Sequence, residues 1–286
     1  MTPTPKTIQI FLPVGDPRGL RVAEITMLTV QVIEVPRSRL DEFARLPESS
    51  QVGVYFLFGS VTEGDYPQVY IGQTGDLRTR LANHDSKKPF WQRALVLVSR
   101  TNSLTQTHAL FLESHCLKLA TEAGRYRVEN GNAGSKPHTP APLEADCLEI
   151  FETGSILLSI LGFPLFEPLA QVVSKGVEMF HCTSAGTDGR GLMTDDGFVV
   201  FKGSVGRRAN SRGIQGEFHE QFRTKLIQSG VMREDGERVI FEKDHLFRSP
   251  SMAAVALLGR SANGWKEWKT DEGRTLDEVK RRGAGL

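Results

Sequence analysis

Long apolar runs and close cysteine pairs are both missing from this 286-residue sequence. No stretch approaches the roughly 18 apolar residues that span a bilayer. The N-terminus also lacks a charged head followed by an apolar segment, so no signal peptide is expected. The three cysteines stand far apart, which excludes the paired spacing of zinc sites and redox motifs. We therefore expect a soluble cytoplasmic protein with no membrane contact.

An excess of charge of one sign is absent as well. Lysine and arginine together number 35, against 34 acidic residues. A nucleic-acid-binding surface would therefore have to come from local clustering of basic residues. The length exceeds that of one average domain, and the 39% hydrophobic content is enough for more than one core. Two or three domains are expected.

The order of strand and helix signals predicts an α+β fold. Three short β-type runs suggest an N-terminal β appendage over residues 1–48. Residues 49–132 carry signals in the order β-β-α-β-α, typical of a small mixed or antiparallel sheet flanked by helices. Turn-rich sequence followed by an apolar periodic stretch indicates a linker and connecting helix over 133–175. Tight turns between β-type runs in 176–286 predict a second α+β domain.

Glu113 lies within a predicted helix and shares one helical face with Leu110 and Leu117. A carboxylate in an apolar stripe is unfavourable unless a cation or several donors meet it, so this position is a candidate metal ligand. The alternative is an apolar stripe centred elsewhere, with Glu113 at its margin. That stripe would consist of Leu112, Cys116, Leu119 and Ala123.

A second predicted helix places Arg80 and His84 one turn apart. Asp76 can cap this helix, while Leu77 and Leu81 form its apolar seam. An arginine can clamp a phosphate oxygen and a histidine can orient water or carry a proton. The plainer interpretation is a solvated helix face.

Two tyrosines lie in short strands next to glycines, in Gly53-Val54-Tyr55 and Tyr70-Ile71-Gly72. Glycine permits close approach of backbone or substrate. Each tyrosine alone is also typical of an ordinary strand residue with its ring on the core.

Taken in order, these features resemble the GIY-YIG nuclease family. Gly53-Val54-Tyr55 departs conservatively from the first motif, and Tyr70-Ile71-Gly72 matches the second in full. Arg80, ten residues after Tyr70, and His84, four residues later, match the family's catalytic arginine and its histidine or tyrosine. Glu113 matches the metal-binding glutamate, and either Asn130 or Asn132 resembles the asparagine that closes the site.

The resemblance implies a bacterial endonuclease that hydrolyses DNA phosphodiester bonds by a one-metal mechanism, in repair, restriction or mobile-element biology. Glu113 would hold Mg²⁺ or Mn²⁺ against a phosphate oxygen and the leaving 3′ oxygen. Tyr55, Tyr70 and His84 would position and deprotonate the attacking water, and Arg80 would stabilise the transition state. No organic cofactor is expected. The alternative is a catalytically inactive nucleic-acid-binding or assembly protein that retains the fold.

Further basic residues are candidates for contact with nucleic acid. Lys87 and Lys88 follow the Arg80 helix, and Arg207, Arg208 and Arg212 lie in a stretch without an acid. A pair of loop lysines is more often plain surface. Whether the arginine stretch tracks phosphates or is merely solvated stays open.

The sequence from about Phe247 onward resembles an uncharacterised domain found behind bacterial GIY-YIG modules. Its Trp265 and Trp268 alternate with lysines and could stack on bases. We favour the alternative, in which both tryptophans close a small core against leucines such as Leu257 and Leu276.

Overall fold

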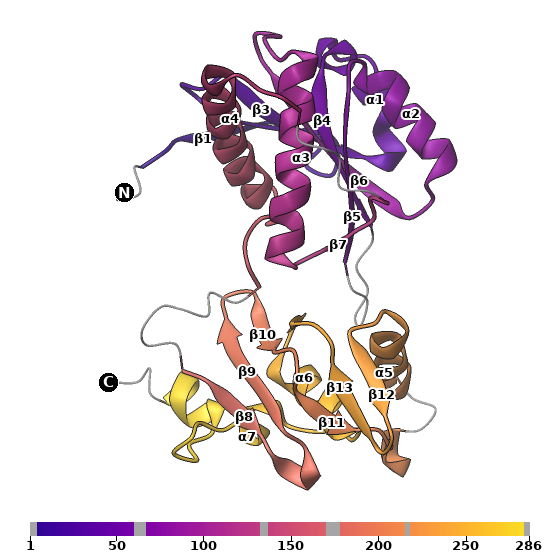
Figure 1. Ribbon diagram of the computed structural model, residues 1–286, viewed down its shortest axis with the longest axis vertical. Helices are drawn as coiled ribbons and strands as arrows, with labels where there is room; N and C mark the ends of the chain where they lie inside the picture. Colours follow the sequence, from indigo (N-terminus) through magenta and orange to yellow (C-terminus); the bar gives the residue numbers. More distant parts are fainter. Residues whose placement is uncertain (1–4, 60–66, 132–136, 170–177, 215–217, 283–286) are drawn as a thin grey trace. The chain divides into compact units, whose positions relative to one another are not determined.

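The computed structural model describes residues 5–59, 67–131, 137–169, 178–214 and 218–282. The fold class is α+β, as expected. The chain divides into two compact units, each described by itself: residues 1–61 with 67–167, and residues 62–66 with 168–286 (Figure 1). Among the described helices, none combines the length and apolarity needed to cross a membrane.

A seven-stranded sheet forms the centre of the first unit. Its strands are Ile8–Phe11 (β1), Arg21–Ile25 (β2), Val30–Pro36 (β3), Gly53–Gly59 (β4), Gln68–Thr74 (β5), Trp91–Ser99 (β6) and Arg127–Val128 (β7). Its helices are Leu40–Phe43 (α1), Leu77–Lys87 (α2), Gln106–Ala123 (α3) and Ala141–Ile160 (α4). The strand order is β1-β2-β3-β6-β4-β5-β7, and only the β5–β7 pair is parallel.

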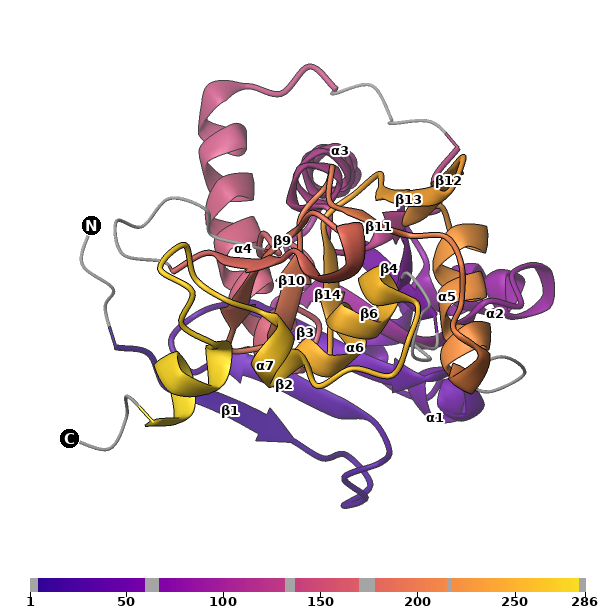
Figure 2. The same ribbon diagram turned by 90° about the horizontal axis from the view of Figure 1, so that it is seen from below.

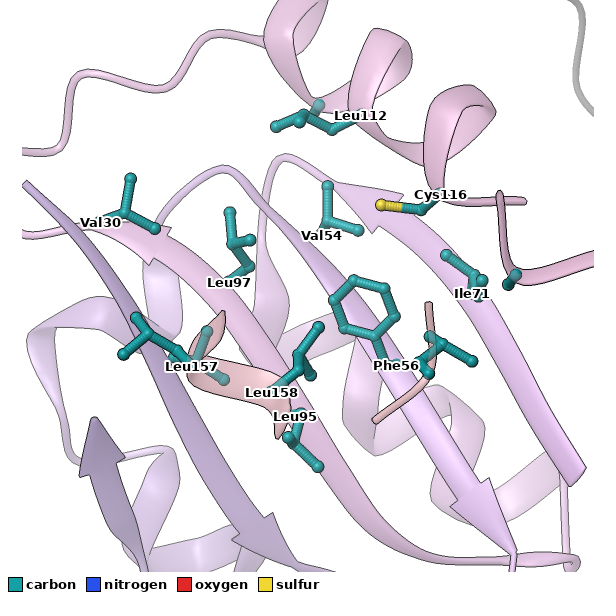
Figure 3. Packing of buried hydrophobic residues seen from close by; sticks show 14 of the residues in the cluster. Val30, Val54, Phe56, Ile71, Leu95, Leu97, Leu112, Cys116, Leu157 and Leu158 are labelled. Atoms are coloured by element: carbon teal, nitrogen blue, oxygen red, sulfur yellow. The ribbon is translucent and has the colours of Figure 1, made fainter. Parts of the chain in front are cut away.

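Helices cover both faces of this sheet (Figures 1 and 2). On one face, α3 and α4 bury a core that includes Val54, Phe56, Leu97, Leu112 and Leu157 (Figure 3). On the other face, α1 and α2 cover a second core formed by alternate residues of the same strands. The sheet is therefore a middle layer, and neighbouring residues of a strand serve different cores.

The N-terminal strands belong to this sheet, which differs from the separate appendage expected over residues 1–48. Strand β3 pairs with β6 along its whole length, from Val30 opposite Ser99 to Pro36 opposite Arg93. All seven of its residues are buried. Pairing with a strand some sixty residues away leaves no local signal in the sequence, so the short β-type runs suggested an independent element.

The helix expected as a connection within 133–175 also belongs to the first unit. Helix α4 contributes Cys147, Leu157 and Leu158 to the core it shares with α3. It lies so close to the sheet that a Cβ on Gly154 would come within 2.3 Å of a methyl group of Leu97. The compact unit that contains residues 49–132 therefore extends well beyond that range on both sides.

The second unit contains two small antiparallel sheets around a buried helix. Its strands are Phe180–Cys182 (β8), Gly189–Thr194 (β9), Gly197–Val200 (β10), Val205–Arg207 (β11), Met232–Asp235 (β12), Arg238–Phe241 (β13) and His245–Phe247 (β14). Its helices are Phe218–Gln228 (α5), Pro250–Leu258 (α6) and Gly264–Glu267 (α7). The strand orders are β14-β10-β9-β8 and β11-β13-β12.

Trp268 lies in the core of the second unit, as favoured from the sequence. It is fully buried, and its indole N–H donates to the carbonyl of Pro250 at 3.0 Å. The centroids of the Trp268 and Phe198 rings are 4.4 Å apart. Trp265 packs at the margin of the same core. Base stacking is thus not the role of Trp268.

A buried carboxylate joins three strands of the first unit. Glu34 in β3 is 1% exposed, accepts a hydrogen bond from Arg93 of β6 at 2.9 Å, and forms an ion pair with Arg21 of β2. Both arginines reach solvent in part. A carboxylate this deeply buried depends on both partners for its stability.

We expect Glu34→Gln to lower the free energy of unfolding by about 2 kcal/mol, because it leaves two guanidinium groups without their buried counter-charge. Urea denaturation measures the change. The matched control is Glu24→Gln, which breaks a more exposed pair with Arg100 at 3.4 Å and should cost less than about 1 kcal/mol. Equal losses in the two variants would contradict the assignment.

Candidate active site

The register of β4 on β5 brings the two motif tyrosines to one face of the sheet. Tyr55 lies opposite Gly72, and Tyr70 lies opposite Leu57, two residues along from Tyr55. Both rings therefore project toward α2. Their centroids are 6.3 Å apart with an interplanar angle of 26°.

Gly72 makes room for the hydroxyl of Tyr55. A Cβ at position 72 would lie 2.3 Å from that hydroxyl oxygen, closer than any side chain allows. Tyr55 itself is fully buried, with 0% of its surface exposed. Any larger residue at position 72 would overlap the Tyr55 hydroxyl, which explains the glycine in the second motif.

Helix α2 adds an arginine and a histidine from its inner edge. Asp76 caps the helix by accepting the backbone N–H of Thr79 at 3.2 Å, as the sequence predicted. The seam residues Leu77 and Leu81 are fully buried. One turn apart on the adjoining face, His84 is 6% exposed and Arg80 is exposed to solvent.

Hydrogen bonds run in one direction from Arg80 through Tyr55 to His84. The Nε–H of Arg80 donates to the Tyr55 hydroxyl at 2.9 Å, and that hydroxyl lies 2.8 Å from Nε2 of His84. A guanidinium can only donate, so the proton of Tyr55 is free to point at His84. Nε2 then accepts, and His84 is a neutral imidazole with its proton on Nδ1.

The pKa of His84 is lowered from 6.5 to about 4. Burial is the largest cause, followed by the positive charges of Arg80, Lys88 and Lys87. Burial likewise raises the pKa of Tyr55 well above its usual range, and Arg80 opposes this shift only in part. At neutral pH the pair is therefore a phenol donating to a neutral imidazole.

Glu113 reaches the same site from α3, and it lies at the margin of the buried stripe rather than within it. Leu112 and Cys116 are buried, whereas Leu110 is 37% exposed. The expected stripe is thus wrong at Leu110 but correct at Leu117, which is buried. The alternative stripe is correct at Leu112 and Cys116, while Leu119 and Ala123 are half-buried. The half-buried carboxylate accepts the backbone N–H of Gln73.

Burial raises the pKa of Glu113, while the Gln73 N–H and the charge of Arg80 oppose that shift. Arg80 is therefore close enough to Glu113 to affect its ionisation. Among the described residues, no group of three or more His, Cys, Asp or Glu side chains could hold a metal ion. A single carboxylate still fits Mg²⁺ or Mn²⁺, because magnesium keeps several waters and commonly uses one or two carboxylates together with substrate phosphates.

Asn130 closes the edge of β5 beside the tyrosines. Its side-chain oxygen accepts the N–H of Ile71 at 3.0 Å, and its side-chain nitrogen donates to the Ile71 carbonyl at 2.7 Å. Asn130 thus fixes the strand that carries Tyr70. The alternative residue, Asn132, lies outside the described residues.

The two lysines after α2 differ in environment. Lys87 is exposed, whereas Lys88 is half-buried with its Nζ 4.1 Å from the centroid of the Tyr70 ring. Tyr55, Tyr70, Arg80, His84, Lys88 and Glu113 are thus brought together in the first unit.

The arginine stretch belongs to the second unit. Arg207, Arg208 and Arg212 are exposed. The stretch itself contains no acidic residue. Glu234 of strand β12 nevertheless forms an ion pair with Arg208 at 3.1 Å. That pairing reduces the positive charge available for phosphates.

Sequence reasoning missed Arg223, which organises the same stretch from inside. Its guanidinium is 2% exposed and donates to backbone carbonyls of Arg207, Arg208 and Ala256 and to the side chain of Asn210. Burial lowers its pKa to about 10. An arginine among the polar residues of α5 carries no sequence signal that separates it from a surface residue.

Comparison with known proteins identifies part of the second unit. Residues 180–280 match the family model described as Domain of unknown function (DUF4357). This domain accompanies some nuclease-like proteins, which agrees with the resemblance stated for the C-terminal sequence. No GIY-YIG family model matches. Searches of curated proteins and of solved structures return no match.

The shifted pKa of His84 predicts a pH-dependent stability. Between about pH 6.5 and 4, His84 is protonated in the unfolded chain but stays neutral in the folded protein. The free energy of unfolding should therefore fall as pH drops through this window, by about 3 kcal/mol in total, and level off below it. Urea denaturation at several pH values tests this. In His84→Gln, which can still accept from Tyr55, this contribution should vanish. The same pH slope in both proteins would contradict a neutral His84.

Proposed function

We propose that the chain is a divalent-metal-dependent endonuclease of the GIY-YIG type that hydrolyses DNA phosphodiester bonds, in repair, restriction or mobile-element biology. The observation that carries the proposal is the gathering of two phenols, a guanidinium, an imidazole and a carboxylate from four separate elements. These groups match the needs of phosphodiester hydrolysis: a base, a clamp for phosphate charge and a hard oxygen ligand.

The directed hydrogen bonds suggest how the attacking water loses its proton. The water would give a proton to the oxygen of Tyr55 as Tyr55 passes its own proton to Nε2 of His84. The oxygen of the deprotonated water then attacks phosphorus, and the 3′ oxygen departs with the electrons of its bond to phosphorus. His84 ends as an imidazolium, so the proton count balances. The low pKa of His84 limits how long it holds that proton and favours its release to solvent.

Arg80 has two roles in this proposal. Its Nε–H donates to the Tyr55 oxygen, and its guanidinium also interacts with Tyr70 and with Glu113, which leaves further N–H groups for a substrate. Those groups would stabilise the negative charge that builds on the phosphate oxygens. A divalent cation held by Glu113 would supply Lewis-acid stabilisation of the phosphate and the leaving oxygen.

A half-buried carboxylate favours catalysis over passive binding. A protein that only binds polyanions gains nothing from Glu113, because a carboxylate repels phosphate unless a cation lies between them. The position would therefore be unfavourable in an inactive assembly protein of the same fold.

We expect Glu113→Gln to abolish magnesium-dependent nicking of supercoiled plasmid while DNA affinity stays within a few fold, because the amide removes the charge that attracts the metal. Gel analysis of plasmid forms measures nicking, and fluorescence anisotropy measures affinity. Glu122→Gln is the matched control, since Glu122 lies on the same helix and forms an exposed ion pair with Lys118 at 3.9 Å. Full nicking by Glu113→Gln would remove this residue from the metal site.

We expect Arg80→Ala to lower the cleavage rate by about 10²- to 10³-fold, because the transition state loses a preorganised donor. Its thermal unfolding midpoint should change little, since Arg80 is exposed. Arg78→Ala serves as the control, because Arg78 leaves the same helix toward Ser49 instead of the site. A normal single-turnover rate in Arg80→Ala would refute the clamp.

A further inference from the structure

Lys88 is held in place by the fold rather than left as a mobile surface lysine. It follows the last residue of α2, and its N–H donates to the carbonyl of His84 at 2.9 Å. Its own carbonyl accepts from Arg37 at 3.4 Å, and Arg37 also donates to the carbonyls of Pro89 and Trp91 at 3.0 and 3.2 Å. The backbone at position 88 is therefore fixed from both sides.

The side chain of Lys88 lies against the site. Its ammonium is 4.1 Å from the centroid of the Tyr70 ring. The centroids of the Tyr70 and His84 rings are 5.3 Å apart. Among the described residues, no carboxylate forms an ion pair with this ammonium. A cation over an aromatic face keeps its N–H groups available on the side away from the ring.

Two cations thus flank the tyrosines, Arg80 at Tyr55 and Lys88 at Tyr70. Both disfavour a charge on His84, which therefore stays neutral at neutral pH and leaves two cations beside the tyrosines. A phosphodiester chain would supply negative charge to both of these cations. One phosphate lying at Arg80 would place a neighbouring phosphate of the same strand toward the Lys88 side.

We propose that Lys88 binds a phosphate group of the DNA strand next to the phosphate that is cleaved, and that the ring of Tyr70 positions its ammonium for this contact. The proposal rests on the nuclease function argued above. It separates Lys88 from Lys87, the adjacent residue with the same charge and an exposed side chain.

The test uses the full chain without magnesium, so that binding is measured independently of cleavage. Fluorescence anisotropy with a labelled DNA duplex gives the dissociation constant at several salt concentrations. Loss of one phosphate contact lowers the slope of log affinity against log salt by about 0.9. Between about 50 and 200 mM salt, wild-type affinity should therefore fall about threefold more than that of Lys88→Gln.

Lys87→Gln is the matched control and should keep the wild-type slope. Lys88→Arg should restore most of it, because a guanidinium can also lie over Tyr70 and bind phosphate. Equal slopes in wild type and Lys88→Gln, equal losses in the two glutamine variants, or no DNA binding by the wild type would overturn the proposal. Thermal unfolding of each variant shows whether the fold is kept.

Plasmid nicking with magnesium separates this proposal from the proposed function. If wild type binds with the steeper slope but does not nick, the phosphate contact stands and the nuclease assignment fails. If wild type nicks and Lys88→Gln has an unchanged slope, the nuclease assignment stands and the role of Lys88 fails.

Discussion

The antiparallel register of β4 on β5 is the constraint on which the candidate site depends. It sets Tyr55 against Gly72 and brings Tyr70 to the same face. A slip of one residue in this pairing would turn one of the two rings into the core beneath α3 and α4 and separate the tyrosines. The space above Gly72 then determines where the Tyr55 hydroxyl lies, and only there can Arg80 and His84 both reach it. The pairing that builds the sheet also positions the chemistry.

Burial acts on this site in one consistent direction. It lowers the pKa of His84 and raises the pKa values of Tyr55 and Glu113, so each group is pushed toward its neutral form. Arg80 is the charge that opposes the shifts of Tyr55 and Glu113. Such an arrangement is destabilising by itself, and the two cores of the sheet must offset it. An anionic substrate together with a cation would supply charges that complement those of the cluster.

Local patterns were enough to predict α2 and the side chains that it carries. The Asp76 cap and the seam of Leu77 and Leu81 predicted α2, and the four-residue spacing predicted that Arg80 and His84 share an edge. Long-range pairing could not be predicted in this way. Partners of β3 and Arg208 lie far along the chain, so the sheet membership of the N-terminal strands and the neutralisation by Glu234 left no local signal.

The short length of β7 explains how residues from both sides of the sheet share one site. Strand β7 pairs with β5 only at residues 68 and 69, so the outward backbone groups farther along β5 need other partners. Asn130 satisfies both groups of Ile71, and Glu113 accepts the N–H of Gln73. A full-length neighbouring strand would occupy those groups and cover the edge. Because the edge stays open, a carboxylate from α3 can pass it and approach Arg80 on the opposite face.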